Sequence, residues 1–213
     1  VLAASLTKSA AVTVAGDEMQ QSDETVLFQG WKHTLALLGV RHVEADRLTT
    51  NYRCPASVAN FAHKVLGPLA PAKEPESPRE GAPVAVDHFP ADGVAMTAIT
   101  EKLDDLLRRE PRASVAIIAR DLDSAGALHE GLKEHLPDLR YVPDGEFSFQ
   151  PGVDLTDVAQ IKGLEFDYVI LPDVTIGNYP ESPTDRRALH VAATRAIHQL
   201  WVCSTGVTSP LLP

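Results

Sequence analysis

Short apolar runs alternate with amphipathic segments along this chain, most regularly after residue 83. The run Ser114–Ala119 is almost wholly apolar, which is typical of a strand buried on both faces of a parallel sheet. Shorter strands are predicted at Val84–Phe89, Leu139–Val142, Val153–Val158, Tyr168–Leu171 and Gln199–Cys203. Helices are predicted at Val94–Arg109, Ser124–Leu136 and Asp185–Ala196. This alternation predicts an α/β fold with a mostly parallel sheet flanked by helices.

The first 66 residues follow a less regular pattern. Ala11–Ala15 is predicted as a short buried strand that ends at a Gly-Asp turn, and Val40–Leu48 as another strand. Trp31–Leu38 is predicted as a helix stopped by Gly39. A second helix is predicted at Pro55–Leu66, with one apolar face made of Val58, Phe61, Ala62 and Val65.

Residues 67–83 interrupt both patterns. The segment holds Pro68, Pro71, Pro75, Pro78 and Pro83 with charged residues between them. Such a composition cannot bury a core, so we expect an exposed and mobile loop.

Composition narrows the class of protein. An apolar content of 44% with 23% charged residues is ordinary for a soluble globular protein. No apolar run approaches the ~18 residues that a membrane span needs, and Cys54 and Cys203 form no metal-type pair, which fits a reducing cytoplasm. A formal net charge of −10 argues against a broad nucleic-acid-binding surface. Any nucleic-acid contact must therefore come from a local site.

The stretch from Thr156 to Pro172 combines strand, turn and charge. It reads as a short strand, a Lys162-Gly163 break, an exposed Glu165 and a second apolar strand. This pattern predicts a polar group at the carboxyl edge of the sheet. A few residues later comes Asp185-Arg-Arg-Ala-Leu-His-Val-Ala-Ala-Thr-Arg-Ala196, a helical stretch with arginines at both ends.

Together these two stretches resemble motifs V and VI of the UvrD/Rep-like superfamily 1 helicases. Gly16-Asp-Glu-Met-Gln20 resembles motif III of that family, and Leu48-Thr-Thr-Asn-Tyr-Arg53 resembles motif IV, in the same order along the chain. The resemblance implies a RecA-like (P-loop NTPase-type) fold. Residues 1–47 would then be the tail of the first motor domain and residues 48–213 the second motor domain.

The resemblance also implies an ATP site shared between two domains. Gln20 would sense the terminal phosphate, Arg53 and Arg195 would contact it, and Glu165 would hold the ribose. Lys162, Gly163 and Arg187 would support the site. Arginines suit this role because the transition state of phosphoryl transfer spreads negative charge over oxygens that guanidinium groups neutralise with bidentate hydrogen bonds.

The sequence departs from the family in ways that change the expected activity. It contains no Gly-x-x-x-x-Gly-Lys-Ser/Thr loop and no Asp-Glu pair after an apolar strand to hold Mg²⁺. Ala159 stands where the family usually has a His. With no initiator Met and a start just ahead of motif III, the chain is expected to be a fragment that does not hydrolyse ATP alone.

In the full-length protein, the expected partners are an N-terminal motor domain that brings the Mg²⁺ ligands, and single-stranded DNA. The small second domain and the ending Ser209-Pro-Leu-Leu-Pro213 look most like relatives that act on RNA polymerase. The alternative is a non-catalytic RecA-like module that docks on a partner protein, such as RNA polymerase or a repair complex. The scattered histidines indicate no metal site.

Overall fold

The computed structural model describes residues 13–21, 28–39, 46, 48–74 and 76–213. Its centre is a six-stranded sheet in the order β1-β6-β5-β2-β4-β3, in which all neighbouring strands are parallel. The strands are β1 (Ala85–Phe89), β2 (Ser114–Ala119), β3 (Arg140–Tyr141), β4 (Gly152–Asp157), β5 (Phe166–Leu171) and β6 (Ala196–Thr205). The predicted α/β class and parallel sheet are confirmed.

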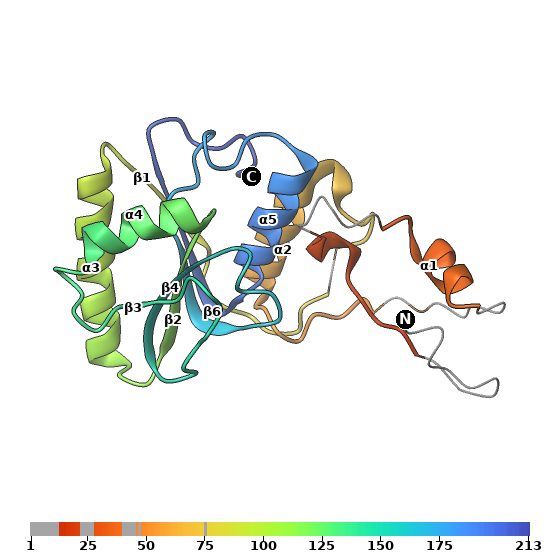
Figure 1. Cartoon of the computed structure of the whole chain (residues 1–213), viewed down its shortest axis with the longest axis horizontal. Coiled ribbons are helices and arrows are strands. Elements are labelled where there is room, and N and C mark those ends of the chain that lie inside the picture. The colour runs from red at the N-terminus through yellow and green to blue at the C-terminus, as the bar shows by residue number, and fades with distance from the viewer. Residues whose placement is uncertain (1–12, 22–27, 40–45, 47, 75) are drawn as a thin grey trace.

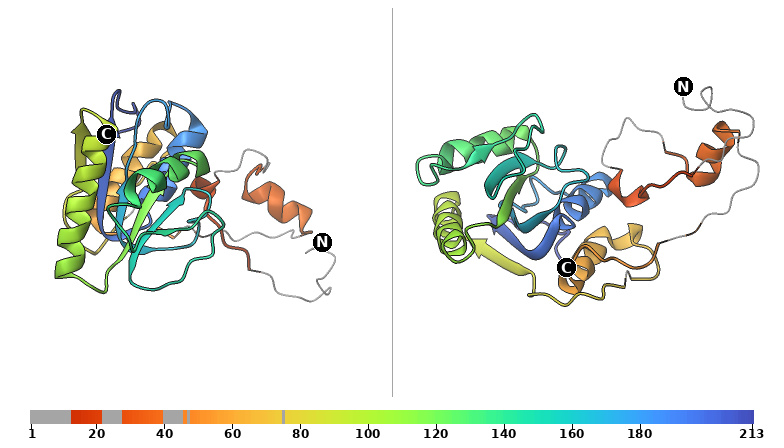
Figure 2. Two further views of the ribbon diagram at one scale, coloured as in Figure 1. Left: turned by 60° about the vertical axis from the view of Figure 1, so that its left-hand side comes forward. Right: turned by 90° about the horizontal axis from the view of Figure 1, so that it is seen from below.

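Helices cover both faces of the sheet (Figures 1 and 2). Helices α3 (Asp92–Arg109) and α4 (Leu122–Leu132) lie on one face, and α2 (Ala56–Leu66) and α5 (Pro183–Ala193) on the other. In β2, Val115 and Ile117 point into the core under α3 and α4, while Ala116 and Ile118 point into the core under α2 and α5. A strand with two buried faces needs an apolar run, because successive side chains alternate between the faces.

Most predicted boundaries agree with the structure to within two residues, and β2 has the predicted bounds. Helix α4 is an exception, since it ends at Leu132 rather than Leu136. Helix α5 ends at Ala193 because Thr194 and Arg195 form the turn into β6, which begins at Ala196.

The predictions for the N-terminal part are only partly confirmed. Helix α1 (Trp31–Leu37) forms as predicted, but residues 13–15 are exposed and have no regular structure, so the buried strand predicted there is wrong. Among the residues that the structure describes, no strand pairs with them, and a short apolar run alone does not make a strand. Most of the strand predicted at residues 40–48 lies outside the described residues. Figures 1 and 2 show α1 standing apart from the sheet.

The proline-rich segment is exposed, as predicted, but hydrogen bonds tie it to the domain. Thr50 pairs with Glu76 in an isolated parallel bridge. Arg79 donates from Nη1 to the carbonyl of Arg53 (2.6 Å) and from Nη2 to the carbonyl of Ile197 (3.0 Å). The expectation of a mobile loop overlooked these bonds, because composition shows what a segment cannot bury but not what its polar groups can bond.

No helix among the described residues is long and apolar enough to cross a membrane. Trp201 lies in the core, with 6% of its surface exposed. Trp31 does not, because no residue of α1 is buried; its ring packs edge-on against Phe28 at a centroid distance of 5.3 Å.

Candidate functional site

The predicted site residues lie at the amino end of the sheet, not at the carboxyl edge. Glu165 directly precedes β5 and Arg195 directly precedes β6. Because all the strands are parallel, residues 158–165 must carry the chain from the carboxyl end of β4 back to the amino end of β5. The turn uses Gly163 at φ 83°, a left-handed conformation that favours glycine. The expected carboxyl-edge position was wrong for this reason.

Arg53 and Glu165 form an ion pair at this end of the sheet. Arg53 Nε lies 2.9 Å from Glu165 Oε2, and the side chains remain 39% and 54% exposed. The Asn51 carboxamide oxygen accepts hydrogen bonds from the backbone N–H groups of Arg53 (2.9 Å) and Cys54 (3.1 Å). The buried Cys54 thiol donates to the carbonyl of Thr194 at 3.2 Å. The loop that carries Arg53 is thereby fixed to the turn after α5.

Arg195 lies behind this pair and is fully buried, with 0% of its surface exposed. Its Nε donates to the carbonyl of Val191 (3.0 Å), its Nη1 to the carbonyl of Leu164 (3.1 Å) and its Nη2 to Thr194 Oγ1 (3.2 Å). Burial lowers the pKa of Arg195, and the nearby positive charge of Arg53 lowers it further. Arg195 therefore holds the backbone beside Glu165 and offers no exposed surface to a ligand in this structure.

Gln20 lies on the 3₁₀ helix η2 (Glu18–Gln20), which packs against α5. Its amide Nε2 donates to Asp17 Oδ2 at 2.8 Å. The Asp17 carboxylate is close enough to raise the pKa of both His190 and Arg195, although burial leaves both pKa values lowered. The structure thus places the motif III segment beside α5 and near Arg195. The role of Gln20 toward a nucleotide stays a prediction.

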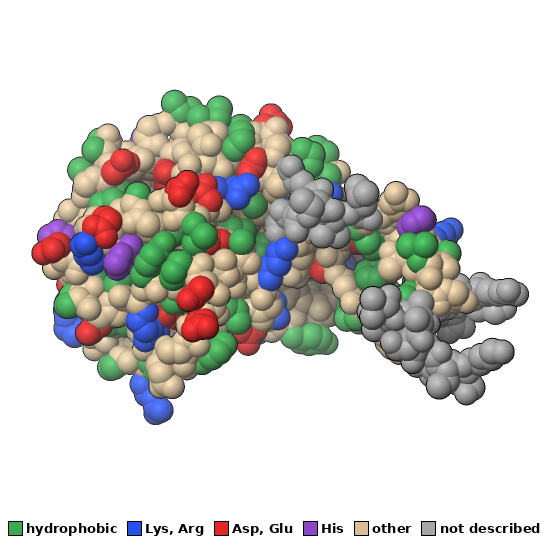
Figure 3. All heavy atoms as spheres, in the orientation of Figure 1, with side chains coloured by type: hydrophobic (Ala, Val, Ile, Leu, Met, Phe, Trp, Pro, Cys, Tyr) green, Lys and Arg blue, Asp and Glu red, His purple; other side chains and the backbone are tan. Residues whose placement is uncertain are grey.

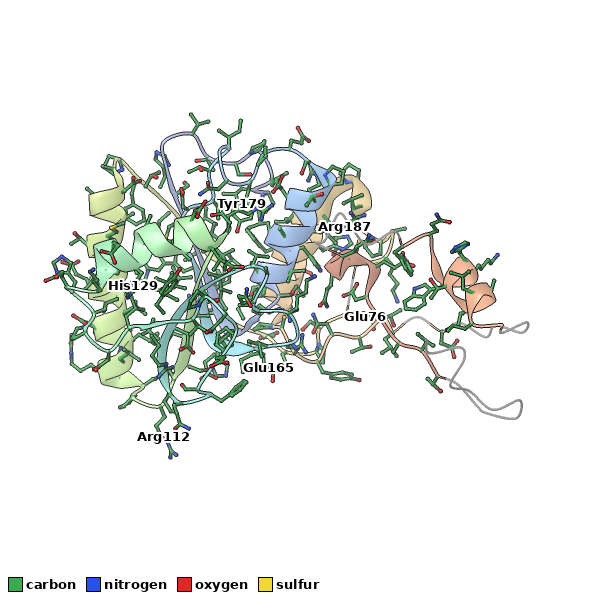
Figure 4. The ribbon with its side chains drawn as sticks, viewed as in Figure 1. Glu76, Arg112, His129, Glu165, Tyr179 and Arg187 are labelled. Carbon is green, nitrogen blue, oxygen red and sulfur yellow. The ribbon has the colours of Figure 1, made fainter. Side chains whose placement is uncertain are left out.

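The remaining predicted site residues are Lys162, Gly163 and Arg187. Lys162 and Gly163 are exposed in the turn before Glu165. Arg187 lies on α5, and Figure 4 shows it well away from Glu165. The Arg187 Nε is buried and has no hydrogen-bond partner among the described residues. Arg187 is therefore not brought to the Arg53–Glu165 pair.

A pocket of about 500 Å³ opens beside the ion pair. Arg53, Gly163 and Glu165 line it together with Phe147 and Phe149. Neither phenylalanine was predicted as a site residue, because both lie in a segment without helix or strand periodicity. Two aromatics separated by one residue, in a Gly- and Pro-containing loop before a strand, were the only available signal.

A second polar cluster, also missed, lies at the carboxyl end of β2. Arg120 directly follows β2 and donates from Nε (3.0 Å) and Nη2 (2.8 Å) to Asp185 Oδ1 near the start of α5. Asp185 Oδ2 in turn accepts from Ser182 Oγ, the N-cap of α5, at 2.6 Å. This cluster joins the sheet to α5, so we assign it a structural role.

The described residues contain no group of three or more His, Cys, Asp or Glu that could hold a metal ion. On the face of the molecule shown in Figure 3, acidic and basic side chains are interspersed, without a continuous basic strip. A face without a continuous basic strip agrees with the net negative charge of −10. The pocket beside the ion pair presents an exposed guanidinium, an exposed carboxylate and an aromatic wall.

Comparison with known proteins supports the resemblance drawn from the sequence. A family model described as the UvrD-like helicase C-terminal domain matches residues 152–203, which include Glu165 and Arg195. The fold is similar to the C-terminal domain of a possible DNA helicase from Lactobacillus plantarum WCFS1, with a TM-score of 0.62 and 25% identity, over 76% of this chain and 92% of that one.

A weaker likeness links the chain to the Hef helicase domain of Pyrococcus furiosus (TM-score 0.37, 13% identity, 52% of this chain and 26% of that one). No curated protein matches the sequence. The predicted resemblance is confirmed: residues 152–203 carry the sequence pattern, and the six-stranded sheet the architecture, of a UvrD-like helicase C-terminal domain.

Proposed function

We propose that this chain is the second motor domain of an ATP-dependent superfamily 1 DNA helicase or translocase, with residues 1–47 continuing from the first motor domain. The observation that carries the proposal is the Arg53–Glu165 pair, which is exposed, lines a pocket and lies near enough to the buried Arg195 for their charges to interact. An ATP site between two motor domains needs such an edge, on which one domain presents a cation to the phosphates bound by the other.

The residues present fit the phosphates and ribose of ATP. The ion pair with Glu165 uses the Nε of Arg53, and 39% of the Arg53 side chain remains exposed to bind phosphate oxygens. The Glu165 carboxylate is an acceptor suited to ribose hydroxyl groups. ATP bound with Mg²⁺ supplies the phosphoryl group whose hydrolysis would drive movement along single-stranded DNA. The described residues offer no Mg²⁺ cluster, so we assign the Mg²⁺ ligands to the first motor domain.

In this proposal the two arginines have different tasks. Phosphate binding would compete with Glu165 for the guanidinium of Arg53 and release the carboxylate toward the ribose. Arg195 would stay in place, hold the carbonyl of Leu164 and add positive potential behind Arg53. Gln20 would report on the terminal phosphate through η2, which packs on the same helix, α5, that leads into Arg195.

The test is the ATPase rate of the full-length protein with Arg53→Ala. Arginines that stabilise the phosphoryl-transfer transition state contribute about 10³-fold or more to the rate, so we expect a loss of about that size. Arg53→Lys keeps the charge without the planar fork and should recover only part of the rate. Arg108→Ala is the matched control, because Arg108 is 74% exposed on α3 and pairs only weakly with Asp105 at 3.6 Å.

Equal rates for the Arg53→Ala and Arg108→Ala proteins would refute the motor and leave the non-catalytic docking module as the better interpretation. The remaining partner expectation has a separate test, since RNA polymerase should copurify with the full-length protein if that association exists. We place the protein in the cytoplasm, which the two free, buried cysteines support.

A further inference from the structure

The proline-rich segment contains a short stretch, residues 76–82, that we call the strap. Its sequence is Glu-Ser-Pro-Arg-Glu-Gly-Ala, and Pro83 follows it. A residue before a proline is biased toward extended backbone, and a proline has no N–H group to donate. Apart from the bridge at Glu76, the strap has no regular structure, and none of its residues is buried. Such a segment must be held mainly by hydrogen bonds to the rest of the domain.

The strap runs alongside the loop that carries Arg53. This loop precedes α2 and has no helix or strand, so the direction of the Arg53 side chain depends on how the loop backbone is held. The Asn51 N–H donates to the carbonyl of Glu76 (2.8 Å), at the start of the strap. Next along the strap, Ser77 Oγ donates to the carbonyl of Cys54 (2.6 Å). The strap therefore holds the loop backbone on both sides of Arg53.

The second half of the strap packs closely on the start of α2. A Cβ atom at Gly81 would lie 2.4 Å from Pro55 Cβ, so only glycine fits this position without a shift of the chain. The Ala56 N–H, which has no intrahelical acceptor at this end of the helix, donates to the carbonyl of Arg79 (2.8 Å). The close contact and the hydrogen bond together fix the strap along the first turn of α2.

Arg79 makes the hydrogen bond that reaches Arg53 itself. Its Nη1 donates to the carbonyl of Arg53 (2.6 Å) and its Nη2 to the carbonyl of Ile197 (3.0 Å). Ile197 lies in β6, two residues after Arg195. One planar guanidinium thereby joins the backbone of Arg53 to the strand that follows Arg195. Burial raises the pKa of the Cys54 thiol, while the charges of Arg53, Arg195 and Arg79 oppose this rise, so all three guanidinium groups lie near that thiol.

We propose that Arg79 is a positioning residue that holds Arg53 in the direction needed to contact the phosphates of ATP. The inference rests on the proposed function, in which Arg53 is the exposed arginine of the ATP site. The sheet is the anchor, because Ile197 belongs to β6, and the irregular loop around Arg53 is the part that is held. Arg79 does not line the pocket beside Arg53, so it acts on the phosphates only through Arg53.

The test is a double-mutant cycle on the ATPase rate of the full-length protein. Arg79→Ala should lower kcat about tenfold to a hundredfold, since a displacement of about 1 Å at a catalytic group has effects of this size. In the Arg53→Ala protein, Arg79→Ala should cause no further loss, because no arginine remains to be positioned. A purely structural role would lower the rate by the same factor in both proteins. Arg79→Lys keeps a donor without the planar fork and should recover part of the rate.

Arg186→Ala is the matched control. Arg186 also ties two segments through a backbone carbonyl, since its Nη1 donates to the carbonyl of Val65 (2.8 Å), but it lies in α5 and does not line the pocket. We expect this variant to keep the wild-type rate. In the 213-residue chain, the NMR signal of the Arg53 Nε–H group reports the ion pair with Glu165. This signal should shift in Arg79→Ala and stay unchanged in Arg186→Ala.

Other outcomes overturn the inference in distinguishable ways. If Arg53→Ala lowers the rate and Arg79→Ala does not, the ATP site stands and the positioning role fails. If Arg53→Ala leaves the rate unchanged, the proposed function fails, and this inference with it. If Arg79→Ala costs the same factor with and without Arg53, or if Arg186→Ala costs as much as Arg79→Ala, the strap serves stability alone. Should Arg79→Ala unfold, Ser77→Ala, which removes the bond to the Cys54 carbonyl, takes its place in the cycle with the same expected dependence on Arg53.

Discussion

Replacing Arg195 should destabilise the isolated chain in the absence of any nucleotide. The side chain is fully buried and its three nitrogen atoms each donate a hydrogen bond inside the domain. An arginine whose only role was to bind phosphate would be exposed and dispensable for folding. The structure instead makes Arg195 part of the core between α5 and the turn before β5.

The size of the effect follows from opposing contributions. Truncating a large, buried side chain to alanine costs about 2–5 kcal/mol, and the carbonyl of Leu164 loses its donor at about 1 kcal/mol. Removing the buried charge returns several kcal/mol of desolvation cost. We expect Arg195→Ala to lower the free energy of unfolding by about 2–3 kcal/mol net. Arg195→Met fills most of the volume without a charge and should stay within about 1 kcal/mol of the wild type.

Urea unfolding of the wild-type, Arg195→Ala and Arg195→Met proteins, followed by circular dichroism, measures these differences in unfolding free energy directly. Arg108→Ala removes an exposed arginine and should change the unfolding free energy by less than about 0.5 kcal/mol. If Arg195→Ala is no less stable than Arg108→Ala, Arg195 is not held as the structure shows. If Arg195→Met is as unstable as Arg195→Ala, the hydrogen bonds and charge matter more than the volume.

Two further predictions concern unpaired polar atoms. Burial raises the pKa of Asp157 above its ordinary value, and Oδ2 has no partner among the described residues, so ionised Asp157 opposes folding at neutral pH. Because the folded state binds the proton more tightly, this penalty fades as the pH falls through the folded pKa. Asp157→Asn should be more stable than wild type in urea at about pH 7, with a smaller advantage at about pH 4; a constant advantage would contradict this. The buried Tyr179 hydroxyl also lacks a described partner, so Tyr179→Phe should raise the free energy of unfolding by up to about 1 kcal/mol, measured by thermal unfolding. Tyr168→Phe, which loses hydrogen bonding to Glu110 (2.8 Å), should instead be neutral or slightly destabilising. A marked loss in Tyr179→Phe would indicate a hydrogen-bond partner for its hydroxyl.

The sheet could be predicted from the sequence because its strands are buried on both faces. Almost every residue of Ser114–Ala119 is apolar, as a strand buried on both faces requires. The bounds of this strand agree with the prediction. The N-terminal run Ala11–Ala15 was equally apolar, but residues 13–15 form no strand. A strand needs a neighbour with free backbone groups, and sequence composition does not show whether one is present.

The residues of the site could be predicted as a set, but their positions could not. The motif resemblance predicted Arg53 and Glu165 as site residues. Their Nε and Oε2 atoms lie 2.9 Å apart, although the two residues are 112 positions apart in the sequence. The sequence predicted the carboxyl edge of the sheet, whereas both residues lie at the amino end. The error arose because the sequence does not show that residues 158–165 cross from one end of the sheet to the other before β5 begins. The burial of Arg195 was equally inaccessible, since arginine is among the residues least often buried.

The difference between the two arginines decides which variant can test catalysis. A lost ATPase activity in Arg195→Ala would follow equally from the lost positive charge near Arg53 and from a loosened turn at Leu164, since the same guanidinium supplies the charge and holds that turn. Arg53 is 39% exposed and makes its ion pair with a side chain that is itself exposed, so its removal should leave the fold intact. Activity lost in Arg53→Ala at unchanged stability therefore reports on the site, whereas Arg195 becomes informative only through Arg195→Met, if that variant keeps the stability and loses the rate.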